Sequence, residues 1–221
     1  MSKTERYRNE WKYLIDTAQK ELICKRLDPM LKLDKHAKNG GYMIRSLYFE
    51  DMYKSAYEEK DAGVLKRKKK FGAYIFKESA SLTKDEVYKI IDGDYEFLLH
   101  SDKPLCREFY IECVSNMMRP RTIVDYDREP WILDEGTVRI TFDMDVRAAI
   151  GSYDIFDSTL PTLSVLEPGK CVMEVKFTEF LPQFVREILP DRASEFTAVS
   201  KYVLCYEKTE YMNSFKYWYE N

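Results

Sequence analysis

Charged and apolar residues alternate with a period of two in several segments of this chain, a pattern typical of β-strands that bury one face. In segment 6–15, for example, Glu10 and Lys12 alternate with Trp11 and Tyr13. Strands predicted from this alternation and from short apolar runs cover residues 6–15, 42–49, 64–78, 121–128, 137–143 and 171–178.

Helix signals lie between and after these strands. Asp16 can cap a helix that runs to about Leu27, and Thr83 with Glu86 forms a capping box for a helix that ends near Ile91. Strands at both ends of the chain, with helices between and after them, indicate an α+β class with an antiparallel sheet or barrel. Further helices are predicted at 51–60, 104–118, 181–189 and 200–207.

The polar faces of the strands carry both signs of charge. In segment 171–178, Glu174 and Lys176 share one face, and Met173 and Val175 lie on the other. Each strand alone is compatible with a solvated outer face. However, amphipathic helices are available to cover the apolar faces, and the charged faces would then line the lumen of a closed barrel. Such a lumen is costly unless it holds anions and a metal, and phosphate with a divalent cation satisfies both signs.

Composition narrows the class of protein. The chain has 35 basic and 38 acidic residues, a net charge of −3, which excludes a generic nucleic-acid binder of high pI. Two His and five Cys without a CxxC pair favour reduced thiols over a disulfide framework or a zinc site. No signal peptide or transmembrane run is visible, so we expect a cytoplasmic protein. No linker divides the chain, so we expect one domain over residues 1–221.

Six short segments occur in one order along most of the chain: RNEWKYLI, IRSLYFED, RPRTIVDYDRE, VRITFD, VMEVKF and SKY. Each is weak alone, but the ordered set resembles the VTC domain, the polyphosphate polymerase domain of the triphosphate tunnel metalloenzyme superfamily. The resemblance implies a closed antiparallel β-barrel tunnel wrapped by α-helices, the triphosphate tunnel fold.

The resemblance also implies a site in which basic residues bind phosphate and a carboxylate holds Mn²⁺ or Mg²⁺. Glu174 of VMEVKF matches the metal-binding glutamate of the family, and Glu10 matches the glutamate of the first-strand signature. Arg8 stands where the wider superfamily often has another acid. Four basic residues match phosphate-binding positions and, together with Glu174, are expected to carry catalysis: Lys12, Arg128, Arg139 and Lys201.

Four further positions are candidates for phosphate contacts. Lys176 lies on the same strand face as Glu174, and Lys77 matches a basic position of the family. Lys68, in the basic run Lys66–Lys70, is a local substitute for phosphate ligands of the family that this region is too short to contain. Arg45 is a candidate only if its face of the strand at 42–49 points inward, rather than the opposite face, which carries Ser46 and Tyr48.

The chain departs from the family pattern between Val64 and Tyr74. The family normally has a strand with an Arg-x-Arg pair and then a strand with an Ile-x-x-Glu-x-Lys pattern, and this region is too short for both. Within the run Lys66–Lys70, Arg67 and Lys68 are the local substitutes. Either a segment is missing here, or two central phosphate ligands are absent, which calls catalysis into question. The run is also compatible with a solvated strand end or a nucleic-acid patch.

The reaction that the resemblance implies is transfer of the γ-phosphate of ATP, or of another nucleoside triphosphate, to a growing inorganic polyphosphate chain. Two alternatives stay open. One is a hydrolase of the same superfamily that acts on inorganic triphosphate or a nucleoside triphosphate. The other is a module that binds polyphosphate without turnover. The sequence leaves the oligomeric state open, and coupling to export across a membrane would require a partner protein.

Overall fold

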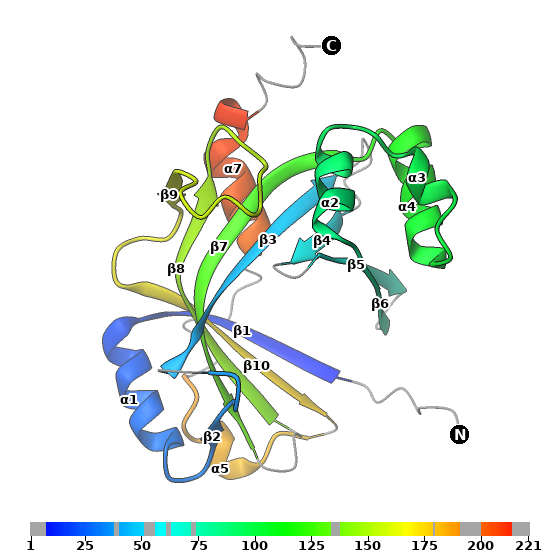
Figure 1. Cartoon of the computed structure of the whole chain (residues 1–221). Coiled ribbons are helices and arrows are strands. Elements are labelled where there is room, and N and C mark those ends of the chain that lie inside the picture. Colours follow the sequence, from blue (N-terminus) through cyan, green and yellow to red (C-terminus); the bar gives the residue numbers. More distant parts are fainter. Residues whose placement is uncertain are drawn as a thin grey trace, which may run out of the picture. The chain divides into compact units, whose positions relative to one another are not determined.

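The computed structural model describes residues 8–37, 40–50, 56–60, 63–71, 74–133, 138–178, 180–190 and 200–213. Within these residues a ten-stranded sheet and several helices form the fold, which confirms the predicted α+β class (Figure 1). The main path of the sheet has the strand order β1 (Arg8–Asp16), β10 (Lys170–Thr178), β8 (Val138–Ala149), β7 (Arg119–Ile132), β3 (Tyr42–Glu50), β4 (Ala56–Lys60), β5 (Val64–Phe71) and β6 (Tyr74–Ser81).

Two short strands lie off this path: β2 (Lys32–Leu33) pairs with β7, and β9 (Thr162–Ser164) pairs with β8. The pairs β1–β10, β10–β8, β2–β7, β3–β4, β4–β5 and β5–β6 are antiparallel, as expected. The path over the described residues ends at β1 and β6, and closure of the sheet into a barrel stays a prediction.

Contacts divide the chain into two compact units. The first comprises Met1–Met43, Tyr126–Val146 and Ser164–Leu204, and the second comprises Ile44–Asp125, Arg147–Leu163 and Cys205–Asn221. Within the described residues, no helix is both long and apolar enough to cross a membrane.

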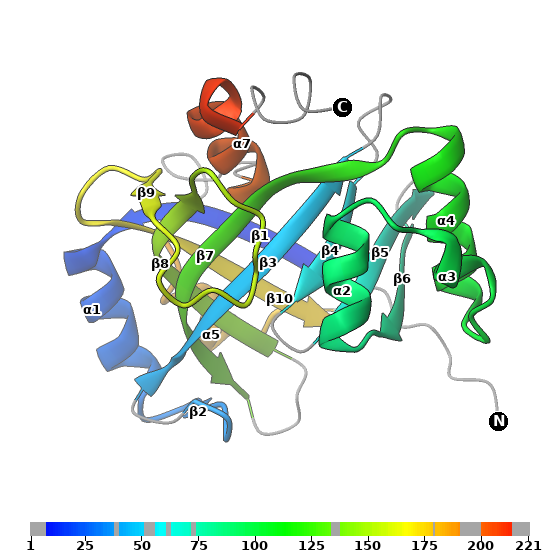
Figure 2. The same ribbon diagram turned by 45° about the horizontal axis from the view of Figure 1, so that its top comes forward.

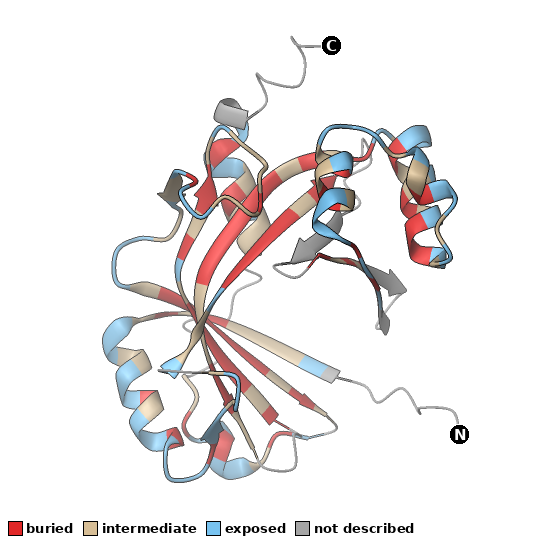
Figure 3. Cartoon of the chain, in the orientation of Figure 1, coloured by how far each residue is buried: buried red, intermediate tan, exposed pale blue. Residues whose placement is uncertain are grey.

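In the first unit, the apolar faces of β1, β10 and β8 form a core with two helices, α1 (Thr17–Leu27) and α5 (Gln183–Arg186). Buried strand residues such as Tyr13, Met173 and Phe142 pack in one cluster with Leu27 of α1 and Val185 of α5. Figure 3 shows the buried positions along β10 and β8. The expectation that helices cover the apolar strand faces is therefore met in this unit.

The start of α1 follows the predicted capping. The Asp16 side chain accepts a hydrogen bond from the Gln19 backbone amide at 2.8 Å, and the Gln19 side chain accepts one from the Asp16 amide at 2.9 Å. This reciprocal cap satisfies two amides that a helix start would otherwise leave without partners. It also joins α1 directly to the end of β1.

In the second unit, three helices pack with strand residues of β3, β5 and β6: α2 (Lys84–Ile91), α3 (Glu96–Leu99) and α4 (Pro104–Ser115) (Figure 2). Phe109 of α4 meets Phe49 of β3 edge to face, with ring centroids 5.3 Å apart. The predicted capping box of Thr83 and Glu86 is confirmed at the start of α2.

Two of the predicted helices were wrong over part of their length. Residues 56–60 of the segment 51–60 form β4, which pairs with β3 and β5; residues 51–55 lie outside the described residues. Non-local strand pairing outweighed the helical spacing of two aromatic residues, since local propensity is a weak determinant of structure. In segment 181–189 only Gln183–Arg186 is α-helical. The helix predicted at 104–118 is confirmed as α4 but ends at Ser115, and the helix predicted at 200–207 is confirmed as α7 (Lys201–Asn213).

The basic run lies in a hairpin. β5 and β6 pair antiparallel over their whole length, with Lys68 directly opposite Lys77. The strand predicted at 64–78 is thus two strands, one on each side of residues 72–73. Only β5 lies within the short region between Val64 and Tyr74, and a missing segment there stays a prediction.

Candidate functional site

The charged faces of β1, β10 and β8 form continuous rows across the first unit. Glu10 pairs with Lys176, which pairs with Arg139 on β8. In the next row, Lys12 pairs with Glu174, which lies opposite a threonine of β8. Because directly opposite residues of neighbouring strands project from the same face, these side chains share one surface. The apolar residues between them face the core described above.

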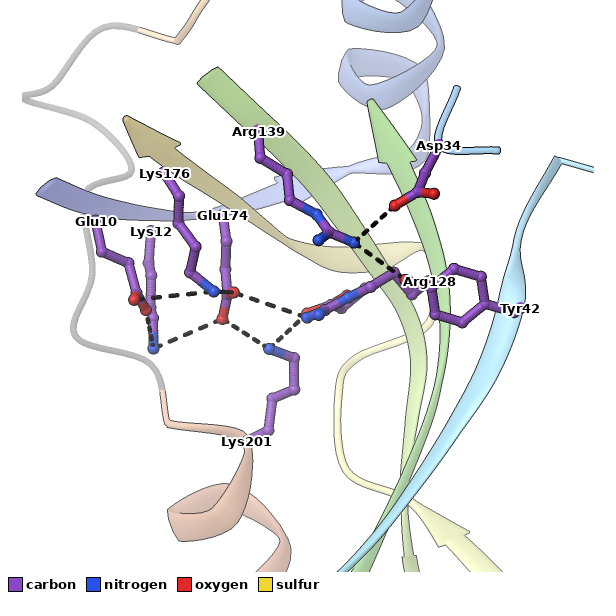
Figure 4. A network of polar contacts seen from close by, with 10 residues as sticks. Glu10, Lys12, Asp34, Tyr42, Arg128, Arg139, Glu174, Lys176 and Lys201 are labelled. Atoms are coloured by element: carbon purple, nitrogen blue, oxygen red, sulfur yellow. Dashed lines mark hydrogen bonds and ion pairs between the residues drawn. The ribbon is translucent and has the colours of Figure 1, made fainter. Parts of the chain in front are cut away.

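Glu174 is the centre of this surface (Figure 4). Its carboxylate accepts hydrogen bonds from the Lys176 ammonium at 2.9 Å and from the Lys201 ammonium at 3.0 Å. The Lys12 ammonium and the Arg128 guanidinium each lie 3.7 Å from a Glu174 oxygen. Only 6% of the Glu174 side chain is exposed. The structure therefore brings four of the predicted basic residues together around the predicted metal-binding glutamate.

The cations around Glu174 determine its protonation. Burial alone raises the pKa of Glu174, but the charges of Lys201, Lys176, Lys12 and Arg128 outweigh burial and hold the pKa well below its usual range. The carboxylate is consequently ionised at any physiological pH, as a ligand of a hard cation must be.

Asp143 is a second buried carboxylate in the site, and the sequence analysis did not identify it. It is fully buried and accepts hydrogen bonds from Nε and Nη2 of Arg128, at 2.6 and 2.7 Å. The Lys201 ammonium lies 2.6 Å from the Asp143 carboxylate. Its position in VRITFD, on the same strand face as Arg139, was the signal that could have identified it.

The two cations that Asp143 binds are strongly held. Burial lowers the pKa of Arg128, but the hydrogen bond and charge of Asp143 reverse this and raise it. The pKa of Lys201 is also raised, because the charges of Asp143 and Glu174 outweigh the effect of burial. Both cations also lie over the Tyr126 ring, Lys201 at 5.0 Å and Arg128 at 5.1 Å from its centroid. Both side chains therefore stay charged in a nearly dry environment.

Glu10 lies beside the lysines at the more exposed side of the cluster. The Lys12 ammonium is 3.2 Å and the Lys176 ammonium 3.9 Å from the Glu10 carboxylate. Burial raises the pKa of Glu10, and Lys176 opposes this so that the net shift is downward. Two lysines thus bridge Glu10 and Glu174, the two carboxylates predicted to hold a metal.

Arg139 lies at the other side of the cluster, with 39% of its side chain exposed. Its Nη2 donates to the Asp34 carboxylate at 3.2 Å and to the Tyr42 hydroxyl at 3.1 Å. Neither Asp34 nor Tyr42 was identified from the sequence. They come from distant segments, and no local pattern placed them beside Arg139.

The donors present suit a hard divalent cation that is bound mainly through its substrate. Within the described residues, no group of three or more His, Cys, Asp or Glu side chains is placed to hold a metal ion. Glu174 and Glu10 supply oxygen ligands only, which Mg²⁺ and Mn²⁺ prefer. Mg²⁺ sites commonly use one or two carboxylates and complete their coordination with water and phosphate oxygens. The protein residues fit such a site.

Arg45, Lys68 and Lys77 belong to the second unit, and their roles in phosphate binding stay predictions. Arg45 is buried and donates from Nε and Nη2 to the Asp125 carboxylate at 2.9 and 2.7 Å. The side chains of Lys68 and Lys77 lie outside what the structure describes. Their neighbour Arg67 is buried and forms ion pairs with the carboxylates of Glu78 and Glu108.

The fold and the site define a class of protein in which an antiparallel sheet with helices gathers five cations and a buried glutamate. The chain belongs to the VTC domain family, whose model matches residues 64–210, about two thirds of its length. The resemblance predicted from the six motifs is therefore confirmed. The match includes β10 and the first turns of α7, while Glu10 and Lys12 lie before it. Among curated proteins no match was found.

Solved structures resemble this chain at low identity. A putative adenylate cyclase from Bacillus halodurans is 13% identical, with a TM-score of 0.50 over 88% of this chain and 93% of its own. A protein from Pyrococcus horikoshii is 12% identical, with a TM-score of 0.46 over 91% of this chain and 99% of its own. At this identity the first likeness shows the fold alone.

Proposed function

We propose that this protein transfers the γ-phosphate of ATP, with the help of a divalent cation, to a growing inorganic polyphosphate chain. The observation that carries the proposal is the convergence of four cations on the buried Glu174 carboxylate: Lys12 of β1, Arg128 of β7, Lys176 of β10 and Lys201 at the start of α7. Arg139 of β8 lies opposite Lys176 and is the fifth cation of the cluster.

Charge balance supports a triphosphate together with a metal. The five cations are opposed by four carboxylates, those of Glu10, Asp34, Asp143 and Glu174, which leaves a net charge of about +1 in the cluster. A triphosphate carries several negative charges, more than this surplus alone can neutralise. A divalent cation held by Glu174 and Glu10 would supply the remaining positive charge and help to neutralise the transferred phosphoryl group.

The protein residues would act mainly by positioning. Asp143 holds one edge of the Arg128 guanidinium, which fixes the direction of its remaining donors. Lys201 is fixed between two carboxylates. Phosphoryl transfer needs little covalent assistance from the enzyme, and aligned cations stabilise the charge on the transferred group.

Arg45, Lys68 and Lys77 are proposed as further phosphate ligands. The backbone register of β5 and β6 places Lys68 directly opposite Lys77. Arg45 would have to exchange part of its contact with Asp125 for phosphate.

The test is incubation with ATP and Mn²⁺, followed by separation of the products on a polyphosphate gel. Long chains support the polymerase. Orthophosphate without chains indicates the hydrolase, and unchanged ATP with tight polyphosphate binding indicates the binding module. Either of the last two results would overturn polymerisation.

A further inference from the structure

Thr141 lies in the middle of the charged face. It stands between Arg139 and Asp143 on the same face of β8, and directly opposite Glu174 of β10. Only 2% of the residue is exposed, and its hydroxyl makes no hydrogen bond with any residue that the structure describes. A buried hydroxyl thus lies within the cluster of charged side chains and has no hydrogen-bond partner among the described residues.

Such a hydroxyl needs an explanation, because leaving a buried donor without a partner costs free energy, and most buried polar side chains have a partner. Valine has nearly the same shape as threonine and suits a buried strand position at least as well. The hydroxyl therefore adds nothing to the packing of β8 that valine would lack.

Arg139, two residues earlier on the same face, provides an independent observation. Its Nε is buried and also makes no hydrogen bond with the described residues, although its Nη2 contacts Asp34 and Tyr42. Two donors without protein partners therefore occur side by side on the surface that gathers the cations. A ligand with several acceptor oxygens would satisfy both.

We propose that Thr141 is a phosphate-binding residue, whose hydroxyl donates a hydrogen bond to a non-bridging oxygen of a triphosphate, next to the Nε–H of Arg139. The inference rests on the proposed function, since it assigns a further ligand to the same site. It explains why a hydroxyl is present at a position where the fold requires only a β-branched shape.

The experiment measures binding of inorganic triphosphate by calorimetry, with a chelator present so that no divalent cation contributes. Thr141→Val removes the hydroxyl, Thr141→Ser keeps it, and Thr122→Val changes a buried threonine of β7 whose hydroxyl lies 3.4 Å from the Ile123 carbonyl oxygen. Hydrogen bonds to charged groups lead us to expect roughly tenfold to a hundredfold weaker binding for Thr141→Val. The other two variants should bind within about threefold of the wild type.

Thermal unfolding without ligand is the second readout. Thr141→Val should melt no lower than the wild type, because it removes a buried hydroxyl that has no protein partner. Wild-type binding in Thr141→Val would overturn the role of Thr141 and leave the proposed function standing. A lowered melting temperature would show that the hydroxyl has a protein partner, and this too would overturn it. If the wild-type protein binds no triphosphate either with the chelator or with Mn²⁺ added, the proposed function itself fails.

Discussion

Arg128 and Asp143 form a two-point ion pair between neighbouring strands, with Nε–Oδ1 and Nη2–Oδ2 distances of 2.6 and 2.7 Å. The aspartate is fully buried and only 12% of the arginine side chain is exposed. In this geometry the carboxylate fixes the plane of the guanidinium and also contacts Lys201. The pair therefore contributes both to the stability of the fold and to the orientation of Arg128 and Lys201, the two cations proposed to bind phosphate.

We predict that Asp143→Asn lowers the free energy of unfolding by about 3–5 kcal/mol, because Arg128 and Lys201 each lose the charge of the buried carboxylate that binds them most closely. Chemical denaturation measures this change. Asp94→Asn, at an exposed position, is the control and should stay within about 0.5 kcal/mol of the wild type. A stability close to the wild type in Asp143→Asn would show that the pair does not form in solution.

Helix α7 offers a matched pair of lysines. Lys201, in its first turn, contacts Asp143 and Glu174, whereas Lys208 on the same helix is exposed. We predict that Lys201→Ala weakens binding of inorganic triphosphate by roughly tenfold to a hundredfold, since a charge-assisted hydrogen bond is lost. Lys208→Ala should bind like the wild type. Equal weakening in both variants would indicate a general charge effect rather than a site.

The low pKa of Glu174 predicts the acid behaviour of the protein. Above the ordinary glutamate value of 4.5 the group is ionised in both states, and its ion pairs contribute fully to stability. Below that value the unfolded chain takes up a proton that the folded protein does not, so stability falls by up to about 1.4 kcal/mol per pH unit. Below pH 4.5, the free energy of unfolding of Glu174→Gln, measured by chemical denaturation, should fall less steeply with decreasing pH than that of the wild type, by up to this amount per pH unit.

An exposed glutamate provides the comparison for this experiment. Glu167→Gln, the same substitution at an exposed position, is the control variant. If Glu174→Gln and Glu167→Gln have the same slope, the cations around Glu174 do not hold its pKa down.

Glu174 also allows a test of metal dependence. We predict that Glu174→Gln or Glu174→Ala loses Mn²⁺-dependent turnover by about two orders of magnitude, because the carboxylate nearest the cations no longer holds the metal. Far-UV circular dichroism should show that the variants still fold. Full metal-dependent activity in either variant would contradict the assignment of Glu174 as a metal ligand.

Gly41 allows a test of how closely the backbone must approach Arg128. A Cβ atom at this position would lie 2.6 Å from the Arg128 carbonyl oxygen, so Gly41→Ala must displace the backbone of β7. We predict a lower melting temperature and at least tenfold weaker triphosphate binding. Gly40→Ala has open space but a φ of +91°, so it should cost about 1 kcal/mol of stability without affecting binding.

The charged faces could be predicted because alternation is a local property. Glu174 and Lys176 lie on one face of a strand whatever that strand pairs with, and the structure confirms this. Capping at Asp16 and Thr83 was predictable for the same reason, since each cap involves residues only three positions apart. Where pairing between strands decided the outcome, as in residues 56–60, the local pattern predicted the wrong element.

The sequence by itself determined which strand faces are charged and which residues match the family motifs, because alternation and motifs are read along a single stretch of chain. Only the tertiary structure decided that Lys12, Arg128, Lys176 and Lys201 meet at one carboxylate. It also decided that Asp143 joins two of them. The physical reason is that these contacts depend on the register between strands and on the position of a helix, which residues far apart in the chain fix together.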